Sequence, residues 1–450
     1  MPSTRHASDP ADVSLLGQPL KFEFSGRTAP NRFLHAAMSE RLASWDFKDV
    51  TSRGIPSESY INAYRRWGEG GFGVILTGNV MIDYYHLECA GNPIIPREAE
   101  FSGERFEAFK ETARQAKAHG SLIVAQVGQA GRQVDERIEK NPVSASDVQL
   151  QSEAARPVTL KSSTSNVSLV STGQKFGKPH AATYDEIARI IDSFAHAAEF
   201  LEQAGFDGIE FHGAHGYLIA QFLSETTNKR ADQYGGSLEN RMRLIMEVAA
   251  ECRKRCSPSF IMGIKINSVE FQEKGFSPEE ARTLCQALEA ATFDFIELSG
   301  GTYESSALYH RRESTKKRES FFLDFADAIV KPLTKTKSYV SGGFKSAGAM
   351  VRALDTVDGV GIGRAVCQEP ILPKEILEGK VPGAVEQDLD ENDFGITLAA
   401  AGAQIRQIGE GNEPIDLSVK ENVKSFEKDL EAWRVRSAQD EEVKEYKWVW

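Results

Sequence analysis

Eight short apolar segments, most of them followed by a stretch of helical periodicity, constrain the fold of this chain most strongly. They lie at 32–38, 72–80, 121–128, 205–212, 260–267, 293–300, 338–344 and 359–364. Strands that alternate with helices form parallel sheets, because each helix carries the chain back to the start of the next strand. Eight such units close a sheet on itself, so the sequence predicts an α/β fold of the (β/α)8 TIM barrel type.

Two capping boxes mark the starts of helices within this pattern. Thr183 is followed three residues later by Glu186, and Ser277 by Glu280, with Pro278 at the first helical position. In a capping box, the two side chains bond backbone N–H groups that the first helical turn leaves unpaired. These boxes support helices in front of the fourth strand and after the fifth.

Two segments interrupt the regular alternation. Residues 20–33 have the pattern of a hairpin that turns at Ser25 and Gly26, and we expect it to plug the bottom of the barrel. Residues 132–182 are long, polar and rich in Ser and Thr. A segment of this length replaces a short loop, so it is either a lid over the mouth or partly disordered.

The C-terminal part of the chain falls outside the eight units. We expect residues 1–381 to form the barrel and residues 382–450 to form an extension that packs on it or trails from it. The helical stretch 419–435 in this extension could dock on the outside of the barrel. Neither the extension nor the insertion has the pattern of a separate domain.

An excess of acidic residues narrows the classes of partner. Among 450 residues, 53 are basic and 65 are acidic, which gives a net charge of −12. This balance argues against nucleic acid or an anionic membrane as the main partner. No apolar run reaches the length of a membrane span, and the N-terminus lacks the apolar core of a secretory signal. The five cysteines fit neither a disulfide framework nor a zinc site, so we expect a cytoplasmic protein.

Alternation along the predicted strands places polar side chains inside the barrel. In the segment 260–267 one parity is wholly apolar and suits the outer helices, so Lys265, of the other parity, points inward. By the same alternation Glu210 and His212 point inward from the segment 205–212. Active sites of TIM barrels lie at the C-terminal ends of the strands, where both Lys265 and His212 fall.

Two imidazoles and a phenol are crowded where the fourth predicted strand ends. They belong to His212, His215 and Tyr217. Such a group can hold an oxygen that gains negative charge and can also deliver a proton. A pair of hydrogen-bonded structural histidines is the alternative, but the clustering and the place at a strand end favour a catalytic role.

Lys265 and Gln126 can each be interpreted in two ways. A lysine inside a barrel is costly unless it meets an anion, which is either Glu210 or a cofactor that becomes anionic, such as a reduced flavin. Gln126 ends the third predicted strand, where it could bond the edge of a planar heterocycle or the backbone of the core.

Three glycine-rich motifs have different meanings. The run 68–73 matches the dinucleotide spacing GxGxxG, but a helix precedes it and a strand follows it, so we interpret it as a helix end. The runs 341–344 and 361–364 end the seventh and eighth strands, the usual phosphate site of a TIM barrel. Glycines there let backbone N–H groups approach phosphate oxygens, and Arg364 adds charge. Tight turns with Arg364 in a structural salt bridge are the alternative.

The stretch HGAHGYLIAQFLSETTNKRADQYGGSLENRMR at 212–243 resembles the old yellow enzyme family of FMN-dependent ene-reductases, and the resemblance extends over about 16–371. It implies FMN across the C-terminal mouth of the barrel and NADH or NADPH as electron donor. It also implies a small enone-type substrate, whose activated C=C bond is reduced.

The resemblance also assigns roles to single residues. His212 and His215 match the pair that grips the substrate carbonyl, and Tyr217 matches the proton donor. The implied FMN contacts are Ala36, Ala37, Met38, Ser39, Asn79, Gln126, His212, Lys265, Gly342, Gly343, Gly363 and Arg364. Ser39 replaces the usual Thr or Cys, and Lys265 replaces the usual Arg, which exchanges a bidentate fork for a point charge.

Other functions were weighed against this one. An NADH oxidase or tailoring reductase of secondary metabolism would use the same FMN site. A metal-dependent lyase or isomerase would use Glu210, His212 and His215 as ligands, but no further carboxylate pair completes the set. A barrel that only binds or scaffolds would have no reason to keep buried charges at its rim.

Some properties stay open at this level. The basic island 311–318 follows the sixth strand and either meets dinucleotide phosphates or is a solvated loop. The preference for NADH or NADPH, the physiological substrate and the formation of a homodimer are not fixed by the sequence.

Overall fold

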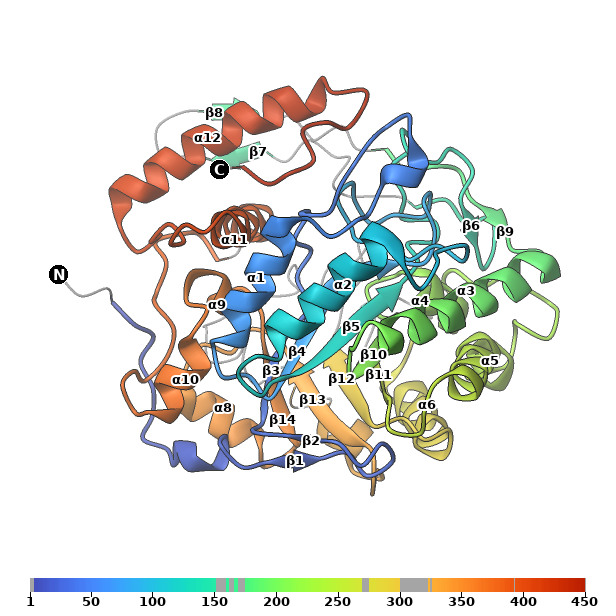
Figure 1. Cartoon of the computed structure of the whole chain (residues 1–450), viewed down its shortest axis with the longest axis horizontal. Coiled ribbons are helices and arrows are strands. Elements are labelled where there is room, and N and C mark those ends of the chain that lie inside the picture. The colour runs from blue at the N-terminus through green and yellow to red at the C-terminus, as the bar shows by residue number, and fades with distance from the viewer. Residues whose placement is uncertain are drawn as a thin grey trace.

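Eight parallel strands among the described residues close into a barrel, which confirms the predicted (β/α)8 fold (Figure 1). The computed structural model describes residues 4–150, 175–268, 275–299, 323, 326–391 and 393–449, and the backbone of 159–161 and 166–168. The barrel strands are β3 (Phe33–His35), β4 (Val74–Met81), β5 (Leu122–Gly128), β10 (Gly208–Gly213), β11 (Ile261–Asn267), β12 (Phe295–Ser299), β13 (Lys337–Ser341) and β14 (Gly359–Ile362).

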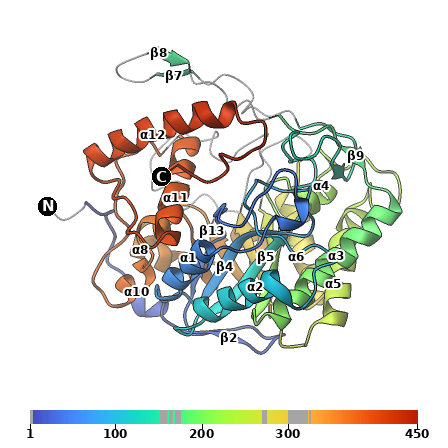
Figure 2. The ribbon, with the colours of Figure 1, turned by 45° about the horizontal axis from the view of Figure 1, so that its top comes forward.

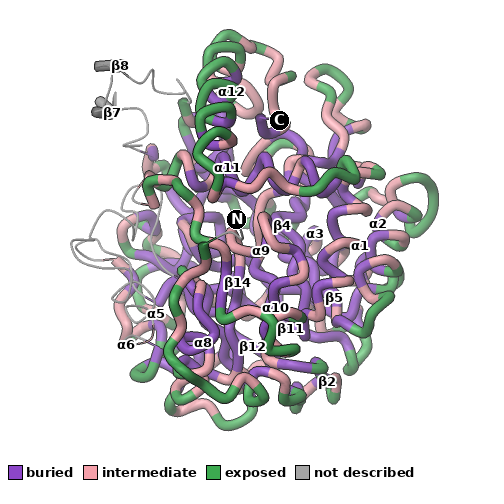
Figure 3. The backbone as a smooth tube through the Cα atoms, turned by 90° about the vertical axis from the view of Figure 1, so that its left-hand side faces the viewer, coloured by how far each residue is buried: buried purple, intermediate pink, exposed green. Residues whose placement is uncertain are grey.

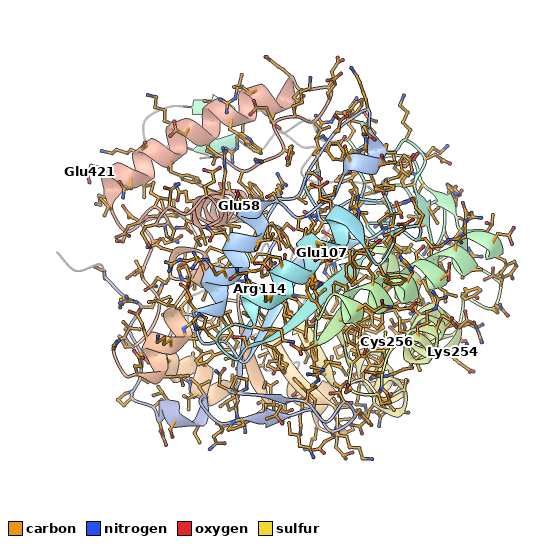
Figure 4. All side chains as sticks on the ribbon, viewed as in Figure 1. Glu58, Glu107, Arg114, Lys254, Cys256 and Glu421 are labelled. Carbon is orange, nitrogen blue, oxygen red and sulfur yellow. The ribbon has the colours of Figure 1, made fainter. Side chains whose placement is uncertain are left out.

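Helices surround the barrel. They are α1 (Glu58–Gly68), α2 (Gly103–Ala116), α3 (Tyr184–Gln203), α4 (Leu218–Leu223), α5 (Leu238–Arg255), α6 (Pro278–Ala290), α8 (Ala347–Ala353), α9 (Ala365–Gln368), α10 (Leu372–Leu377), α11 (Phe394–Gly409) and α12 (Lys420–Ala438). Both predicted capping boxes are present, at the starts of α3 and α6. The helices turn charged faces to solvent, as Glu107 and Arg114 do on α2 (Figure 4).

The glycine run 68–73 is a helix end, as predicted. Helix α1 (Glu58–Gly68) stops there, with the backbone N–H of Gly70 bonded to Trp67 O at 2.9 Å. Strand β4 begins six residues after the helix ends, so a helix precedes the glycine run and a strand follows it. The run therefore lacks the strand–turn–helix context that dinucleotide binding needs.

Strand alternation separates two cores. Side chains such as Met262, Ile264 and Ile266 of β11 pack between the strands and the outer helices, in the large core of the molecule. Ile261 belongs to a smaller core inside the barrel. The predicted orientation of this strand is therefore confirmed, and its polar residue Lys265 lies on the inner side.

A hairpin of β1 (Leu20–Lys21) and β2 (Thr28–Ala29) closes the N-terminal end of the barrel (Figure 1). Leu20, Phe22 and Ala29 share the inner core with residues of the strands. The backbone N–H of Ser25 donates to Asp294 Oδ1 at 2.8 Å, which ties the hairpin to the start of β12. The hairpin thus fills the bottom of the barrel with side chains and leaves the other end for a ligand.

The C-terminal residues form two helices on the outside of the barrel. Helix α11 lies beside α1, where Asn62 Nδ2 donates to Ile408 O at 3.0 Å. Helix α12 crosses over α11 (Figure 2), and the two share an apolar core that includes Ala400, Phe426 and Trp448. The outer side of α12 is exposed (Figure 3).

The ends of the 132–182 insertion are fixed to the barrel. Strands β6 (Val143–Ser144) and β9 (His180–Ala181) pair, and Arg230 Nη1 donates to Ala145 O and Ala182 O at 3.1 and 2.7 Å. The insertion also contains β7 (Thr159–Lys161) and β8 (Asn166–Ser168). Much of it, like the basic island 311–318, lies outside the described residues, so its role as a lid stays a prediction.

None of the helices in the described part of the chain is long and apolar enough to span a bilayer. All five cysteines are free, and Cys256 lies where α5 ends (Figure 4).

Candidate active site

Neighbouring strands bring the predicted polar residues into one layer at the C-terminal end of the barrel. His212 of β10 lies opposite Lys265 of β11, and Lys265 lies opposite Glu297 of β12. On the other side, Glu210 of β10 lies opposite Gln126 of β5. Because parallel strands hold these residues in register, the layer is set by the barrel itself and not by flexible loops.

The two histidines are directly bonded to each other. His212 Nε2 lies 3.2 Å from His215 Nδ1, and His215 Nε2 lies 2.9 Å from the hydroxyl of Ser299. His215 adopts a left-handed backbone conformation at φ 57°, and its N–H donates to Asn267 Oδ1 at 3.2 Å. Such a conformation is unfavourable for a residue with a side chain and persists where the surroundings hold it, often at functional sites.

Both imidazoles are neutral at physiological pH. Burial, the neighbouring imidazole and the charge of Lys265 hold the pKa of His212 well below its usual value. Burial and Lys265 lower the pKa of His215 to about 3. Each neutral ring carries one N–H donor and one acceptor nitrogen, so the pair can donate to an oxygen without carrying a charge itself.

Tyr217 completes this cluster. Its ring centroid lies 4.4 Å from that of His212, and the side chain is 5% exposed. Gly216, at φ 78°, lets the chain turn sharply before Tyr217 caps the start of α4. The structure therefore brings together the three predicted catalytic residues in a site screened from water.

A chain of buried polar groups forms the floor below the histidines. Gln126 Nε2 donates to Glu210 Oε2 at 2.7 Å, and Lys265 Nζ donates to Glu297 Oε1 at 2.8 Å. The direct ion-pair partner of Lys265 is therefore Glu297, whereas Glu210, the structural partner considered from the sequence, acts on Lys265 only through its nearby charge. Glu297 lies directly opposite Lys265 on the next strand, whereas the hydrogen bond of Glu210 points to Gln126.

Charge is balanced within this floor. Burial raises the pKa of Glu210 well above its usual value, and repulsion from Glu297 adds to the effect. Burial alone would also raise the pKa of Glu297, but the attraction of Lys265 lowers it overall. The pKa of Lys265 is raised, because its two carboxylate neighbours outweigh burial. The floor thus holds one ion pair, between Lys265 and Glu297, and a third buried acid, Glu210, whose ionisation is disfavoured.

The segment Ala36–Ser39 crosses the mouth of the barrel as an irregular chain. The prediction that the first strand extends to Met38 is wrong, because β3 ends at His35. Ala36 N donates to Ile362 O at 2.9 Å, and a Cβ at Gly78 would lie 2.3 Å from Met38 O. The glycine thus allows the segment to pass directly over the strand end.

A buried carboxylate supports this segment from behind. Glu40 Oε1 accepts from the backbone N–H of Gly78 at 2.8 Å and from the Tyr64 hydroxyl. Burial raises the pKa of Glu40 to about 7, although both hydrogen bonds act in the opposite direction. Glu40 therefore titrates close to physiological pH.

Asn79 Oδ1 and His212 Nδ1 are among the buried polar atoms at the mouth that have no hydrogen-bond partner within the described residues. A Cβ at Gly128 would lie 3.2 Å from His212 Cβ and 3.8 Å from Asn79 Oδ1, so both side chains border the same strand end. Buried polar atoms are nearly always bonded, so a polar planar ligand such as a flavin fits this place.

The predicted phosphate cradle borders a cavity. Gly342 and Gly343 have φ values of 148° and 81°, and a Cβ at Gly343 would meet no atom within 4 Å. Arg364 Nη1 donates to Thr397 Oγ1 of α11 at 2.6 Å. Residues at the ends of β13 and β14 and just after them line the cavity together with α11. They include Gly343, Lys345, Gly361, Gly363, Arg364 and Thr397. The open glycine Gly343, with Lys345 and Arg364 lining the same cavity, suits a phosphate group.

Three contributors to the site escaped the sequence analysis. Glu297 and Ser299 lie on the sixth strand, where a lone Glu of inward parity among apolar residues was a usable signal. Thr397 lies in the C-terminal extension, and nothing in its local sequence indicates contact with Arg364. Within the described residues, no group of three His, Cys, Asp or Glu side chains is arranged to hold a metal ion.

Comparison with known proteins gives consistent findings. The family model described as the NADH:flavin oxidoreductase / NADH oxidase family matches residues 16–381. The NADH-dependent flavin oxidoreductase nadA of Aspergillus parasiticus is 49% identical over 443 residues, which cover 98% of this chain and 96% of the relative.

Solved structures share the fold. Morphinone reductase in complex with tetrahydroNAD superposes with a TM-score of 0.63 at 23% identity, over 82% of this chain and 92% of that one. The old yellow enzyme homologue from Zymomonas mobilis gives a TM-score of 0.62 at 22% identity, over 84% of this chain and 95% of that one. At this identity the likeness shows a common architecture.

Proposed function

The chain belongs to the NADH:flavin oxidoreductase / NADH oxidase family, the old yellow enzymes, and we propose that it reduces the C=C bond of α,β-unsaturated carbonyl compounds. It is an oxidoreductase that uses FMN and a nicotinamide donor. The observation that carries the proposal is the buried cluster of His212, His215 and Tyr217 at the barrel mouth.

The residues of the mouth fit FMN. Asn79, Gln126 and Lys265 offer polar groups to the edge of the ring system, and the Ala36–Ser39 segment offers backbone beside it. Gly342, Gly343, Gly363 and Arg364 would hold the phosphate at the other end of the site. FMN held there would supply the chemistry of hydride transfer between the nicotinamide and the alkene.

The histidine pair would bind the carbonyl oxygen of the substrate. Because both rings are neutral, each can donate one N–H to the oxygen, on which negative charge grows as the β-carbon is reduced. A carbonyl bound there would replace the bond between the two rings. Donors that are already buried and oriented need no reorganisation during the reaction.

Tyr217 would supply the proton that the α-carbon needs. Its ring centroid lies 4.4 Å from that of His212, so the phenol would lie beside a carbonyl held by the histidine pair. The floor below contributes the Lys265 ammonium, which stays charged and would stabilise negative charge on a bound cofactor. Glu297 holds that ammonium in place at 2.8 Å.

The test separates the two halves of the reaction. In Tyr217→Phe, anaerobic bleaching of the flavin by NADH should keep its rate, while reoxidation by cyclohexenone should slow about 100-fold, the lower end for a lost general acid. Tyr234→Phe is the matched control, because the Tyr234 hydroxyl binds Glu247 at 2.8 Å on the outer helices. Equal loss in both half-reactions would make Tyr217 structural, and a wild-type protein inert toward several enones would refute the proposal.

A further inference from the structure

The C-terminal tail, residues 440–449, returns to the segment that follows β3. Trp45 Nε1 donates to Glu442 O at 3.4 Å, the Tyr446 hydroxyl donates to Ala43 O at 3.3 Å, and Trp448 Nε1 donates to Ser39 O at 3.1 Å. The residue numbers in the tail increase from one contact to the next, while those of their partners decrease from 45 to 43 to 39. The two segments therefore run antiparallel, although the last pair is 409 residues apart in sequence.

The turn beneath the tail has an unfavourable backbone conformation. Arg41 has φ 57°, in the left-handed region that a long side chain rarely adopts. Its guanidinium lies 3.8 Å from the centroid of the Trp448 ring, a cation–π contact. A conformation of this kind persists only where neighbours hold it, and here the tail provides the neighbour.

Two glycines outside the tail, Gly91 and Gly402, allow the tail to pack closely. A Cβ at Gly91 would lie 2.6 Å from ring atoms of Tyr446, so only glycine leaves room for that ring. A Cβ at Gly402 of α11 would lie 2.2 Å from the Trp448 ring. Both aromatic side chains of the tail thus fit against a glycine.

Trp448 is itself held firmly. Trp433 Nε1 of α12 donates to Lys447 O at 3.0 Å, and Arg406 Nη1 of α11 donates to Trp448 O at 2.8 Å. The Trp448 side chain is 5% exposed. Its N–H is therefore a fixed donor, and the position of Ser39 O is linked through it to α11 and α12.

We propose that Trp448 is a positioning residue for the flavin site, because its N–H fixes the backbone of Ser39 in the Ala36–Ser39 segment that lines the mouth. This inference rests on the proposed FMN site at that segment. The tail lies beyond residues 16–381, which the family model matches, so the contact adds an element to the shared barrel. Its expected role is to slow the release of FMN and to set the environment of the flavin ring.

The test compares substitutions that remove one N–H or hydroxyl each in the full-length, FMN-loaded protein. Trp448→Phe keeps an aromatic ring against Gly402 and Arg41 but loses the donor to Ser39. Release of FMN, followed by the recovery of flavin fluorescence after dilution, should become about fivefold faster, as expected for one neutral hydrogen bond. The visible absorption band of the bound flavin should shift as well, which a general loss of stability would not cause.

Two further variants keep the result decisive. Trp433→Phe loses a bond from α12 to Lys447 of the tail but none to the residues after β3, so it acts on Ser39 only indirectly and its FMN release should stay within about twofold of wild type. Tyr446→Phe loses only the hydrogen bond to Ala43, so its rate of FMN release should lie between those of wild type and Trp448→Phe. Faster release in this variant also tests the inference if Trp448→Phe does not fold.

Equal release rates in Trp448→Phe and wild type would overturn the inference, as would equal acceleration in the Trp433 and Trp448 variants. Neither result touches the alkene chemistry, which the half-reactions of the wild-type protein test separately.

Discussion

The two ends of the barrel interior use the same strands for opposite purposes. At the bottom, Phe295 of β12 packs against Phe22 of the hairpin, with ring centroids 5.9 Å apart. The next inward residue along the strand is Glu297, which pairs with Lys265, and the next is Ser299, which bonds His215. Two steps of one strand thus lead from apolar packing to a buried ion pair and then to the cluster of His212, His215 and Tyr217.

The boundary between the two ends is narrow. At Gly263 of β11 a Cβ would lie 2.1 Å from the ring of Phe295, so the glycine makes room for the last apolar layer. Ile261 lies below this level and Lys265 above it. The difference teaches that alternation decides which side chains enter the barrel, whereas distance along the strand decides whether they join an apolar core or a polar site.

The largest expected effect is a loss of stability when the apolar core at the hairpin end of the barrel is disrupted. Phe22→Ala removes a fully buried ring, so the free energy of unfolding in urea should fall by about 4 kcal/mol. Phe24→Ala, on the same hairpin but only half-buried, should cost much less. The folded Phe22 variant should keep the alkene half-reaction of the wild type. Loss of that half-reaction in folded protein would mean that the two ends are not separable.

A second variant tests the buried ion pair at the mouth of the barrel. Glu297→Gln leaves the buried Lys265 ammonium without its ion-pair partner and should lower the free energy of unfolding by about 3 kcal/mol. Glu210→Gln is the matched control, because burial raises the pKa of Glu210 well above its usual value and its side chain bonds Gln126, whereas Glu297 forms the ion pair with Lys265. Urea unfolding at pH 7 should therefore show a large loss in one variant and a small one in the other. The reverse order would mean that Glu210 carries the charge.

A smaller effect concerns pH. The pKa of Glu40 is raised to about 7 in the folded protein, so the folded state binds this proton more tightly than the unfolded state. The stabilisation from the protonated acid is full below pH 4.5 and is lost as pH rises through about 7, with about 1 kcal/mol lost between pH 6 and pH 8.

Glu40→Gln keeps an acceptor for Gly78 N–H and removes the titration. Thermal unfolding from pH 5 to pH 8 should show a flatter dependence of Tm on pH in this variant than in the wild type. Parallel curves would place the titrating group elsewhere.

The sequence was sufficient for features that depend on local pattern. The order of strands, the inward parity of Lys265 and His212, and both capping boxes follow from spacing along a few residues. The sequence left the partner of Lys265 open and missed Glu297, because parity places Glu210 and Glu297 equally inside the barrel. Only the register between strands shows that Glu297 is directly opposite.

Contacts between distant segments were beyond such reasoning. No periodicity connects Trp448 with Ser39, or Thr397 with Arg364, because each pair is made by elements that meet only in the folded chain. The end of β3 at His35 was also missed, since the apolar run continues to Met38 while the backbone leaves the sheet to cross the mouth.

The contact between Trp448 and Ser39 has a consequence for biosynthesis. Residue 39 leaves the ribosome early, and the last of the eight barrel strands ends at residue 362, but the indole that fixes the Ser39 carbonyl is translated 409 residues later. A nascent chain can thus assemble its barrel while this turn is still unanchored. Premature termination between 439 and 447 would yield a product that has every barrel strand and both C-terminal helices but lacks this anchor.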